Sequence, residues 1–192
     1  MNAADIPTAD AAIAATRTWL EKAVIGLNLC PFAKGVYSKR QIRFVVSEAA
    51  MLDDLLDDLE IELQMLVDTA PAVIDTTLLI HPQMFTEFLD YNEFLGVADA
   101  FVDELGFSGE LQVASFHPDY QFAGTSVDDI PNYTNRSPYP MLHLLRESSV
   151  AAAVAAFPET EKIYLKNIDT MRTLGATGWA ALGLTIPTRR KH

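Results

Sequence analysis

The stretch "IDTTLLIHP", residues 74–82, decides the fold, because it is a short aliphatic and β-branched run that a proline ends abruptly. A second stretch of the same kind, "ELQVASFHP", covers residues 110–118 and ends in the same His-Pro dipeptide. Proline disfavours helical backbone at the preceding residue, so His81 and His117 each occupy the last extended position of a predicted strand. If these strands are parallel neighbours, both imidazoles emerge at the carboxyl edge of one sheet, where open α/β sheets bind ligands.

Helical and extended patterns alternate on both sides of these two stretches. The predicted strands are residues 41–47, 74–82 and 110–118, and the predicted helices are residues 8–30, 48–68, 85–106, 139–157 and 159–175. The alternation favours right-handed parallel crossovers. We therefore expect an α/β fold: a small, mostly parallel sheet of three to four strands, flanked by helices. Residues 179–192 are ambiguous between an edge strand and a tail.

Length and composition predict a single globular domain over residues 1–192, with about 1–10 and 187–192 frayed. The chain is 49% hydrophobic and 21% charged, and its net charge of −12 disfavours binding to nucleic acid. Its one cysteine excludes an intramolecular disulfide. There is no secretory signal pattern and no apolar run of the ~18 residues that a bilayer requires. These features predict a soluble cytoplasmic protein without a membrane partner, and they are compatible with a homodimer.

Residues 115–147 form a connection unusually rich in hydrogen-bonding and titratable groups. A long connection in a compact domain is usually functional, and the aromatic residues within it favour a packed loop over a disordered one. Near its end we expect Ser137 to cap a helix that begins at Pro138. In such a helix His143 and Arg146, three positions apart, would share one face, with Arg136 just outside the cap.

These groups suggest an enzyme that acts on a small anionic metabolite bearing phosphate or carboxylate. Arg136 and Arg146 would bind the anion, because a guanidinium matches paired oxygen atoms. His117 or His143 would transfer a proton near neutral pH, and Asp119 would orient a histidine. Further polar candidates for ligand binding from the same segment are Tyr120, Asn132, Asn135 and Ser137.

Cys30 is a separate catalytic candidate. It precedes Pro31, which suits the first position of a helical turn, and Lys34 follows one turn later. A thiolate is favoured at such a helix start. A lone cysteine is also commonly an inert small hydrophobe in a core, and the sequence leaves both interpretations open.

Two other functions remain as alternatives, and the sequence does not indicate a cofactor. The first is a divalent-metal site in which His81 and His117 are joined by a nearby carboxylate or by His143. The second is a non-catalytic interaction module that uses the aromatic and arginine side chains of the loop. The arginines also have a structural interpretation, as members of a salt-bridge network with Glu147, Asp128 or Asp129.

Three stretches, "WLEKAVIGLNLCPFAKGVY", "SFHPDYQFAGT" and "NYTNRSPYPMLHLLRES", resemble the bacterial domain-of-unknown-function family numbered 1415. The resemblance extends from about the first predicted helix through the helix that holds Ile168. It implies no reaction and no residue roles. The residues within the resembling stretches are Cys30, Pro31, Phe32, His117, Pro118, Tyr120, Asn132, Asn135, Arg136, Ser137, Pro138, His143 and Arg146.

Overall fold

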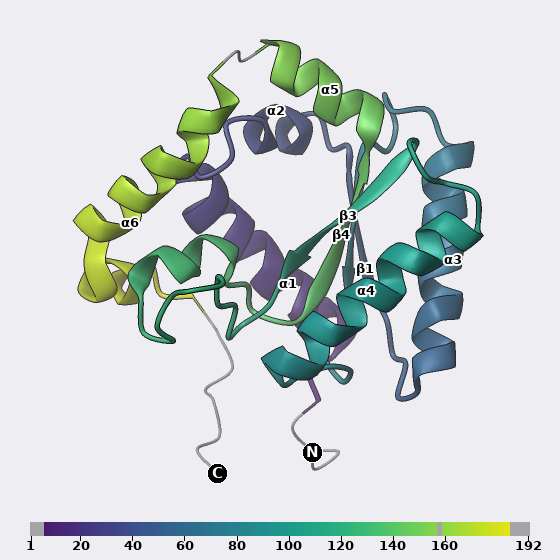
Figure 1. Ribbon diagram of the computed structural model, residues 1–192, viewed down its shortest axis with the longest axis horizontal. Helices are drawn as coiled ribbons and strands as arrows, with labels where there is room; N and C mark the ends of the chain where they lie inside the picture. Colours follow the sequence, from purple (N-terminus) through teal and green to yellow (C-terminus); the bar gives the residue numbers. More distant parts are fainter. Residues whose placement is uncertain (1–5, 157–158, 185–192) are drawn as a thin grey trace.

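A computed structural model describes residues 6–156 and 159–184, which form a four-stranded sheet with helices on both faces (Figure 1). The strands are β1 (Ile42–Val46), β2 (Thr76–Ile80), β3 (Leu111–Phe116) and β4 (Met141–Arg146), in the order β1-β2-β4-β3. β1 pairs with β2 in parallel, whereas β4 is antiparallel to both β2 and β3. The predicted α/β class and flanked sheet are confirmed. The sheet is mixed, with one parallel pair.

Helices pack against both faces of this sheet. They are α1 (Ala9–Trp19), which continues as the π-helix η2 (Leu20–Ile25), then α2 (Ala33–Ser38), α3 (Leu52–Asp68), α4 (Phe88–Glu104), the 3₁₀ helix η3 (Ile130–Asn135), α5 (Glu147–Ala156) and α6 (Thr160–Ala181). In Figure 1, α3 and α4 lie to the right of the sheet, and α1 and α6 lie to the left.

The core has two parts because strand residues alternate between the faces of the sheet. Leu142 and Leu144 of β4 pack into the cluster formed with α3 and α4. Met141 packs into the opposite cluster, which includes Trp19 of α1 and Met171 of α6. The position of a residue along β4 therefore determines which of the two clusters its side chain joins.

The ends of α1 and α4 have the local chemistry that is typical of helix termini. Thr8 caps α1, and its side-chain oxygen accepts a hydrogen bond from the backbone N–H of Ala11 at 3.3 Å. Gly106 follows the end of α4 with a φ of +79°, a conformation that glycine adopts without strain. α6 runs through Ala181, so an edge strand does not begin at residue 179, and residues 185–192 lie outside the described residues.

The prediction of a helix over residues 139–157 was wrong in its first half. Residues 141–146 form β4, and the helix begins only at Glu147, as α5. Ser137 is no helix cap, because its hydroxyl donates to the carbonyl oxygen of Tyr139 at 2.7 Å. The short run Met141–Arg146 is compatible with a helix or a strand when its sequence is taken alone. It forms a strand because it pairs with β2 on one side and with β3 on the other.

Within the described ranges, no helix has both the length and the apolar character needed to cross a lipid bilayer.

Candidate functional site

The two His-Pro histidines lie together at one edge of the sheet, as predicted, although β4 separates their strands. Both pack against the ring of Tyr91 of α4, with ring centroids 5.8 Å away for His81 and 5.0 Å away for His117. The Tyr91 hydroxyl donates to the carbonyl oxygen of Met141 at 2.8 Å and accepts from the N–H of Phe116 at 3.2 Å. Tyr91 thereby joins β3, β4 and both histidines in one buried cluster.

His117 is completely buried, and both of its ring nitrogens bond to backbone. Its Nδ1 accepts from the N–H of Asp119 at 3.0 Å, which leaves Nε2–H to donate to the carbonyl oxygen of Phe85 at 3.1 Å. Burial lowers the pKa of His117 to about 4, so the ring is neutral at pH 7. It braces two loops and has no lone pair left for a substrate or a metal.

His81 is also completely buried. Its Nδ1 donates to the carbonyl oxygen of Met84 at 3.0 Å, and its Nε2 lacks a hydrogen-bond partner among the described residues. Burial lowers its pKa to about 4. No group of three or more His, Cys, Asp or Glu side chains in residues 6–156 and 159–184 is placed to hold a metal ion. The metal-binding alternative stays an untested prediction.

Asn132 holds the polar loop together from inside. Its Oδ1 accepts from the N–H of Phe122 at 3.1 Å and from the hydroxyl of Thr125 at 2.8 Å. Its amide nitrogen donates to the carbonyl oxygen of Ser126 at 2.8 Å. Asn135 likewise donates to the carbonyl oxygen of Ser115, at 3.3 Å. Asn132 therefore holds the loop together, and Asn135 ties the loop to the end of β3.

Arg136 is buried and also serves the loop. Its guanidinium donates to the carbonyl oxygens of Tyr120 at 3.2 Å and Val127 at 2.6 Å, and it lies 4.1 Å from the ring centroid of Tyr133. The Tyr120 ring packs against Phe88, with ring centroids 5.3 Å apart. The Arg136 guanidinium, which the sequence suggested would bind an anion, therefore bonds to the backbone of its own loop.

Arg146 and His143 do not share a face. They lie three positions apart on a strand, so their side chains point to opposite sides of the sheet. Arg146 is buried and donates to the carbonyl oxygens of Leu66, in the last turn of α3, and of Thr69 and Ile74, which follow this helix. The predicted shared helical face was wrong, because these residues belong to β4. Neither arginine forms an ion pair with a described residue, so the proposed salt-bridge network is absent from this part of the chain.

His143 and Cys30 line a pocket of about 340 Å³ on the α1 side of the sheet. Its floor is formed by side chains of all four strands, namely Ile42, Thr76, Leu78, Phe116, His143 and Leu145. Trp19, Leu20 and Val24 line a second side, the segment from Cys30 to Val36 lines a third, and α5 supplies Ser149, Val150, Ala153 and Val154. The lining is predominantly apolar, which is typical of a small-molecule site.

His143 is the polar group that distinguishes this pocket. Its ring packs beside Phe116, with ring centroids 6.0 Å apart, and it forms no hydrogen bond with any residue that the structure describes. Burial lowers its pKa to about 4, so at pH 7 the ring offers one N–H donor and one nitrogen acceptor. The ring is partly buried and lies in the pocket wall without a bond to a described residue, so a polar group of a ligand can pair with it.

Cys30 is partly buried and lies in the pocket wall, outside the helix start predicted for it. Phe32 is the residue at the N-cap of α2, so the thiol is not at the helix N-terminus. The physical reason given for a favoured thiolate therefore does not apply. Cys30 is still of interest, because it lines the same cavity as His143.

Asp75 and Ser149 also line the pocket, although no sequence motif marks either residue. The Ser149 hydroxyl donates to Asp75 Oδ1 at 2.6 Å and ties α5 to the segment before β2. No residue of α5 is buried, although the helix is rich in valine and alanine. An apolar helix that does not pack into the core is the signal that points to a cavity beneath it.

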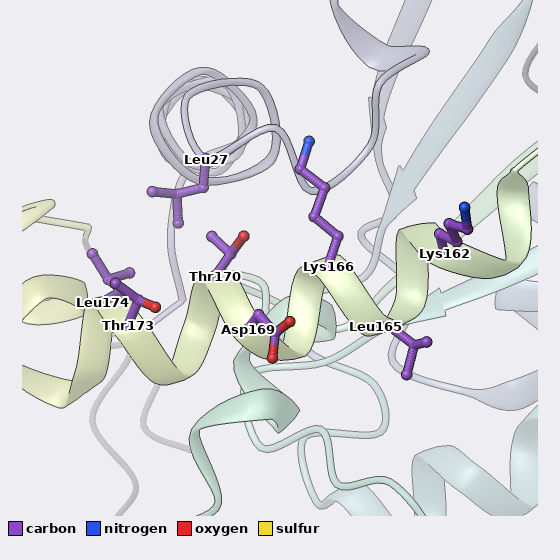
Figure 2. A pocket seen from close by; sticks show the side chains of 8 residues that line it. All are labelled: Leu27, Lys162, Leu165, Lys166, Asp169, Thr170, Thr173 and Leu174. Atoms are coloured by element: carbon purple, nitrogen blue, oxygen red, sulfur yellow. The ribbon is translucent and has the colours of Figure 1, made fainter.

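A second hollow, of about 920 Å³, lies at the surface between α6 and the turn that holds Leu27 (Figure 2). Lys162, Lys166, Asp169 and Thr170 contribute to its wall, and Lys162 pairs with Glu159 at 2.5 Å. Figure 2 shows Lys166 extending toward the turn, whereas Leu165 points the other way. This groove is wide and its charged side chains are solvated, so it is a weaker candidate.

The fold and the pocket define a class: a small α/β protein with a mixed sheet and an apolar, ligand-sized cavity between the sheet and its helical cover. Within that class, the chain matches the family described as "Protein of unknown function (DUF1415)" over residues 11–181, and it belongs to this family. No curated protein and no solved structure matches the chain.

Proposed function

We propose that this protein binds a small, largely apolar molecule in the pocket beneath α5, and that His143 forms the hydrogen bond that orients it. The observation that carries the proposal is the neutral imidazole without a described hydrogen-bond partner in an apolar wall. A ligand that bonds to this ring gains a hydrogen bond worth about 1 kcal/mol, in a pocket whose other lining residues are mostly apolar. Such a small number of placed polar groups fixes the orientation of a ligand in an apolar site.

The proposal replaces the anionic metabolite suggested by the sequence. The guanidinium groups of Arg136 and Arg146 donate to backbone carbonyls, and none of the pocket residues is a lysine or arginine. An anion in this pocket would lack a positive partner. If the pocket also catalyses a reaction, His143 is the candidate base and Cys30 the candidate nucleophile, because both face the cavity.

The proposal also includes the expected partners, cellular location and oligomeric state. A net charge of −12 supports a protein without a nucleic-acid partner, and a single cysteine suits the reducing cytoplasm. We keep a homodimer as an expectation to be checked by the molar mass in solution.

The test uses two naphthalene probes, since an engineered cavity of about 150 Å³ in another protein already holds one benzene ring. The probes are 2-naphthalenemethanol, which has a hydroxyl, and 2-methylnaphthalene, which has none. Equilibrium dialysis should show that both bind. His143→Leu should weaken the alcohol about 10-fold, or about 1.4 kcal/mol, and change 2-methylnaphthalene less than 3-fold.

A matched pair on α5 controls for the location of binding. Ala153 lines the pocket, whereas Ala152 is exposed on the other side of the same helix. Ala153→Phe should fill the cavity and abolish binding of both probes, and Ala152→Phe should leave binding intact. Unchanged binding of both probes in Ala153→Phe would disprove the proposal.

A further inference from the structure

We infer that the natural occupant of this pocket carries a positive charge, held by the carboxylate of Asp75, on an apolar body that lies along the sheet toward His143. The inference rests on the proposed function and names the chemical class of its ligand: a small amphipathic amine.

Asp75 is the one acidic side chain among the described residues that line the pocket, and no lysine or arginine lines it. Its position is fixed from both sides. Its backbone N–H donates to the carbonyl oxygen of Gln41 at 2.9 Å, and its Oδ1 accepts from Ser149 at 2.6 Å.

The Asp75 carboxylate retains capacity for a cation. A carboxylate has about four lone-pair sites, and Ser149 occupies one of them. The described ion pairs join Arg43 to Glu62 and Lys162 to Glu159, so Asp75 has no cationic partner within residues 6–156 and 159–184. A partly buried carboxylate at the end of an apolar cavity is well placed to take an ammonium group.

The register of the sheet sets the distance between the two polar ends. Asp75 directly precedes Thr76, which pairs with Leu145, whereas His143 pairs with Leu78. The three residue steps from Asp75 to Leu78 correspond to about 10 Å along the floor. A ligand with an ammonium at one end, a hydrogen-bonding group at the other and a flat apolar body between them fits this spacing.

Aromatic side chains suit that apolar body. Trp19 and Phe116 form adjacent walls, with ring centroids 5.2 Å apart and an interplanar angle of 71°. Because the two rings pack edge to face against each other, they present one continuous apolar surface to the pocket, against which the ring of a ligand can lie. The charge of the whole chain acts in the same direction, because −12 attracts cations and repels anions of the same shape.

The experiment compares three probes with the same naphthalene body at pH 7: 2-naphthylmethylamine as the cation, 2-naphthalenemethanol as the neutral analogue and 2-naphthoate as the anion. Equilibrium dialysis should show the amine binding at least 10-fold more tightly than the alcohol, and the anion at least 10-fold more weakly. Asp75→Asn, which keeps an acceptor for Ser149, should abolish the advantage of the amine and change alcohol binding less than 3-fold.

Asp53→Asn is the matched control, because Asp53 is exposed on α3 and its substitution changes the net charge equally. This variant should keep the preference for the amine. A preference that survives in Asp75→Asn, or is lost in Asp53→Asn, would overturn the inference. If the wild-type protein binds the alcohol without preferring the amine, the inference alone fails, whereas binding of none of the three probes contradicts the proposed function as well.

Discussion

The loop of residues 117–137 and the pocket beneath α5 differ in whether their polar side chains are hydrogen-bonded within the protein. The loop contains many hydrogen-bonding side chains, and those of His117, Asn132 and Arg136 are engaged with nearby backbone. The pocket contains few, and its central one, His143, bonds to no described residue. Polar side chains of the loop therefore stabilise the fold, whereas the candidate site is marked by a polar side chain that lines a cavity without bonding to a described residue.

The largest expected effect is on the pH dependence of stability, which compares the two His-Pro histidines, His81 and His117, with the pocket histidine, His143. The pKa values of His81, His117 and His143 are lowered from 6.5 to about 4. Between these values the unfolded chain binds more protons, so the stabilisation is complete above pH 6.5 and is lost as the pH falls toward 4. Each histidine should remove about 2 kcal/mol from the free energy of unfolding between pH 7 and pH 5.

Urea denaturation at both pH values measures this effect, and His143→Leu separates the two regions. Between pH 7 and pH 5, the free energy of unfolding of the variant should fall by about 2 kcal/mol less than that of the wild type. His81 and His117 should account for the remaining loss. Equal losses in the two proteins would mean that His143 is hydrated and titrates normally, which would remove the contrast between pocket and loop.

Arg136→Ala tests the structural side of the comparison. We expect a loss of about 3 kcal/mol in the free energy of unfolding, because two charge-assisted hydrogen bonds disappear and the carbonyls of Tyr120 and Val127 become unpaired. Urea denaturation at pH 7 is the measurement. Exposed Arg172 on α6 is the control, and Arg172→Ala should change stability by less than about 0.5 kcal/mol. A small loss for Arg136→Ala would show that its guanidinium is available for a ligand.

The same substitution at two histidines should have opposite signs. His117→Leu leaves the N–H of Asp119 and the carbonyl of Phe85 without partners, and should destabilise the fold by about 2 kcal/mol. His143→Leu removes an unpaired polar group from an apolar wall, and should be neutral or stabilising by up to about 1 kcal/mol. Thermal and urea denaturation of the two variants at pH 7 measure these changes. Similar losses in the free energy of unfolding for both variants would contradict the expected difference in sign.

The smallest expected effect concerns the reactivity of Cys30. It is the only cysteine of the chain and lies in the pocket wall, so alkylation by iodoacetamide reports directly on the cavity. Saturating 2-naphthalenemethanol should slow alkylation at least 3-fold at pH 7, as measured by mass spectrometry. The exposed-face variant Ala152→Phe should show the same protection. An unchanged rate at saturation would place the bound alcohol elsewhere.

The sequence predicted those features that depend on local chemistry. β2 and β3 were predicted because each is a short apolar run that ends at a His-Pro dipeptide, and the meeting of His81 and His117 followed from the shared direction of these strands. β4 was missed because Met141–Arg146 alone suits a helix as well as a strand, and only pairing with distant residues decides between them.

The site was predictable only in part, for a related reason. His143 and Cys30 were identified by residue type, but the reasons given for them, a helix face and a helix start, did not hold in the structure. Asp75 had no motif to mark it. Its relevance arises where the segment before β2 meets Ser149 of α5, a contact between residues 74 positions apart. Whether a side chain is left without a partner depends on the complete fold, which no local pattern encodes.

The place of β4 in the sheet also has a consequence for synthesis on the ribosome. The last strand to be made fills the gap between β2 and β3, so the sheet stays split until residue 146 has left the exit tunnel. A nascent chain that ends earlier presents two unpaired strand edges, each able to template association with another polypeptide. Chaperones that shield such edges during elongation are therefore expected to matter more for this protein than for one whose central strand is translated first.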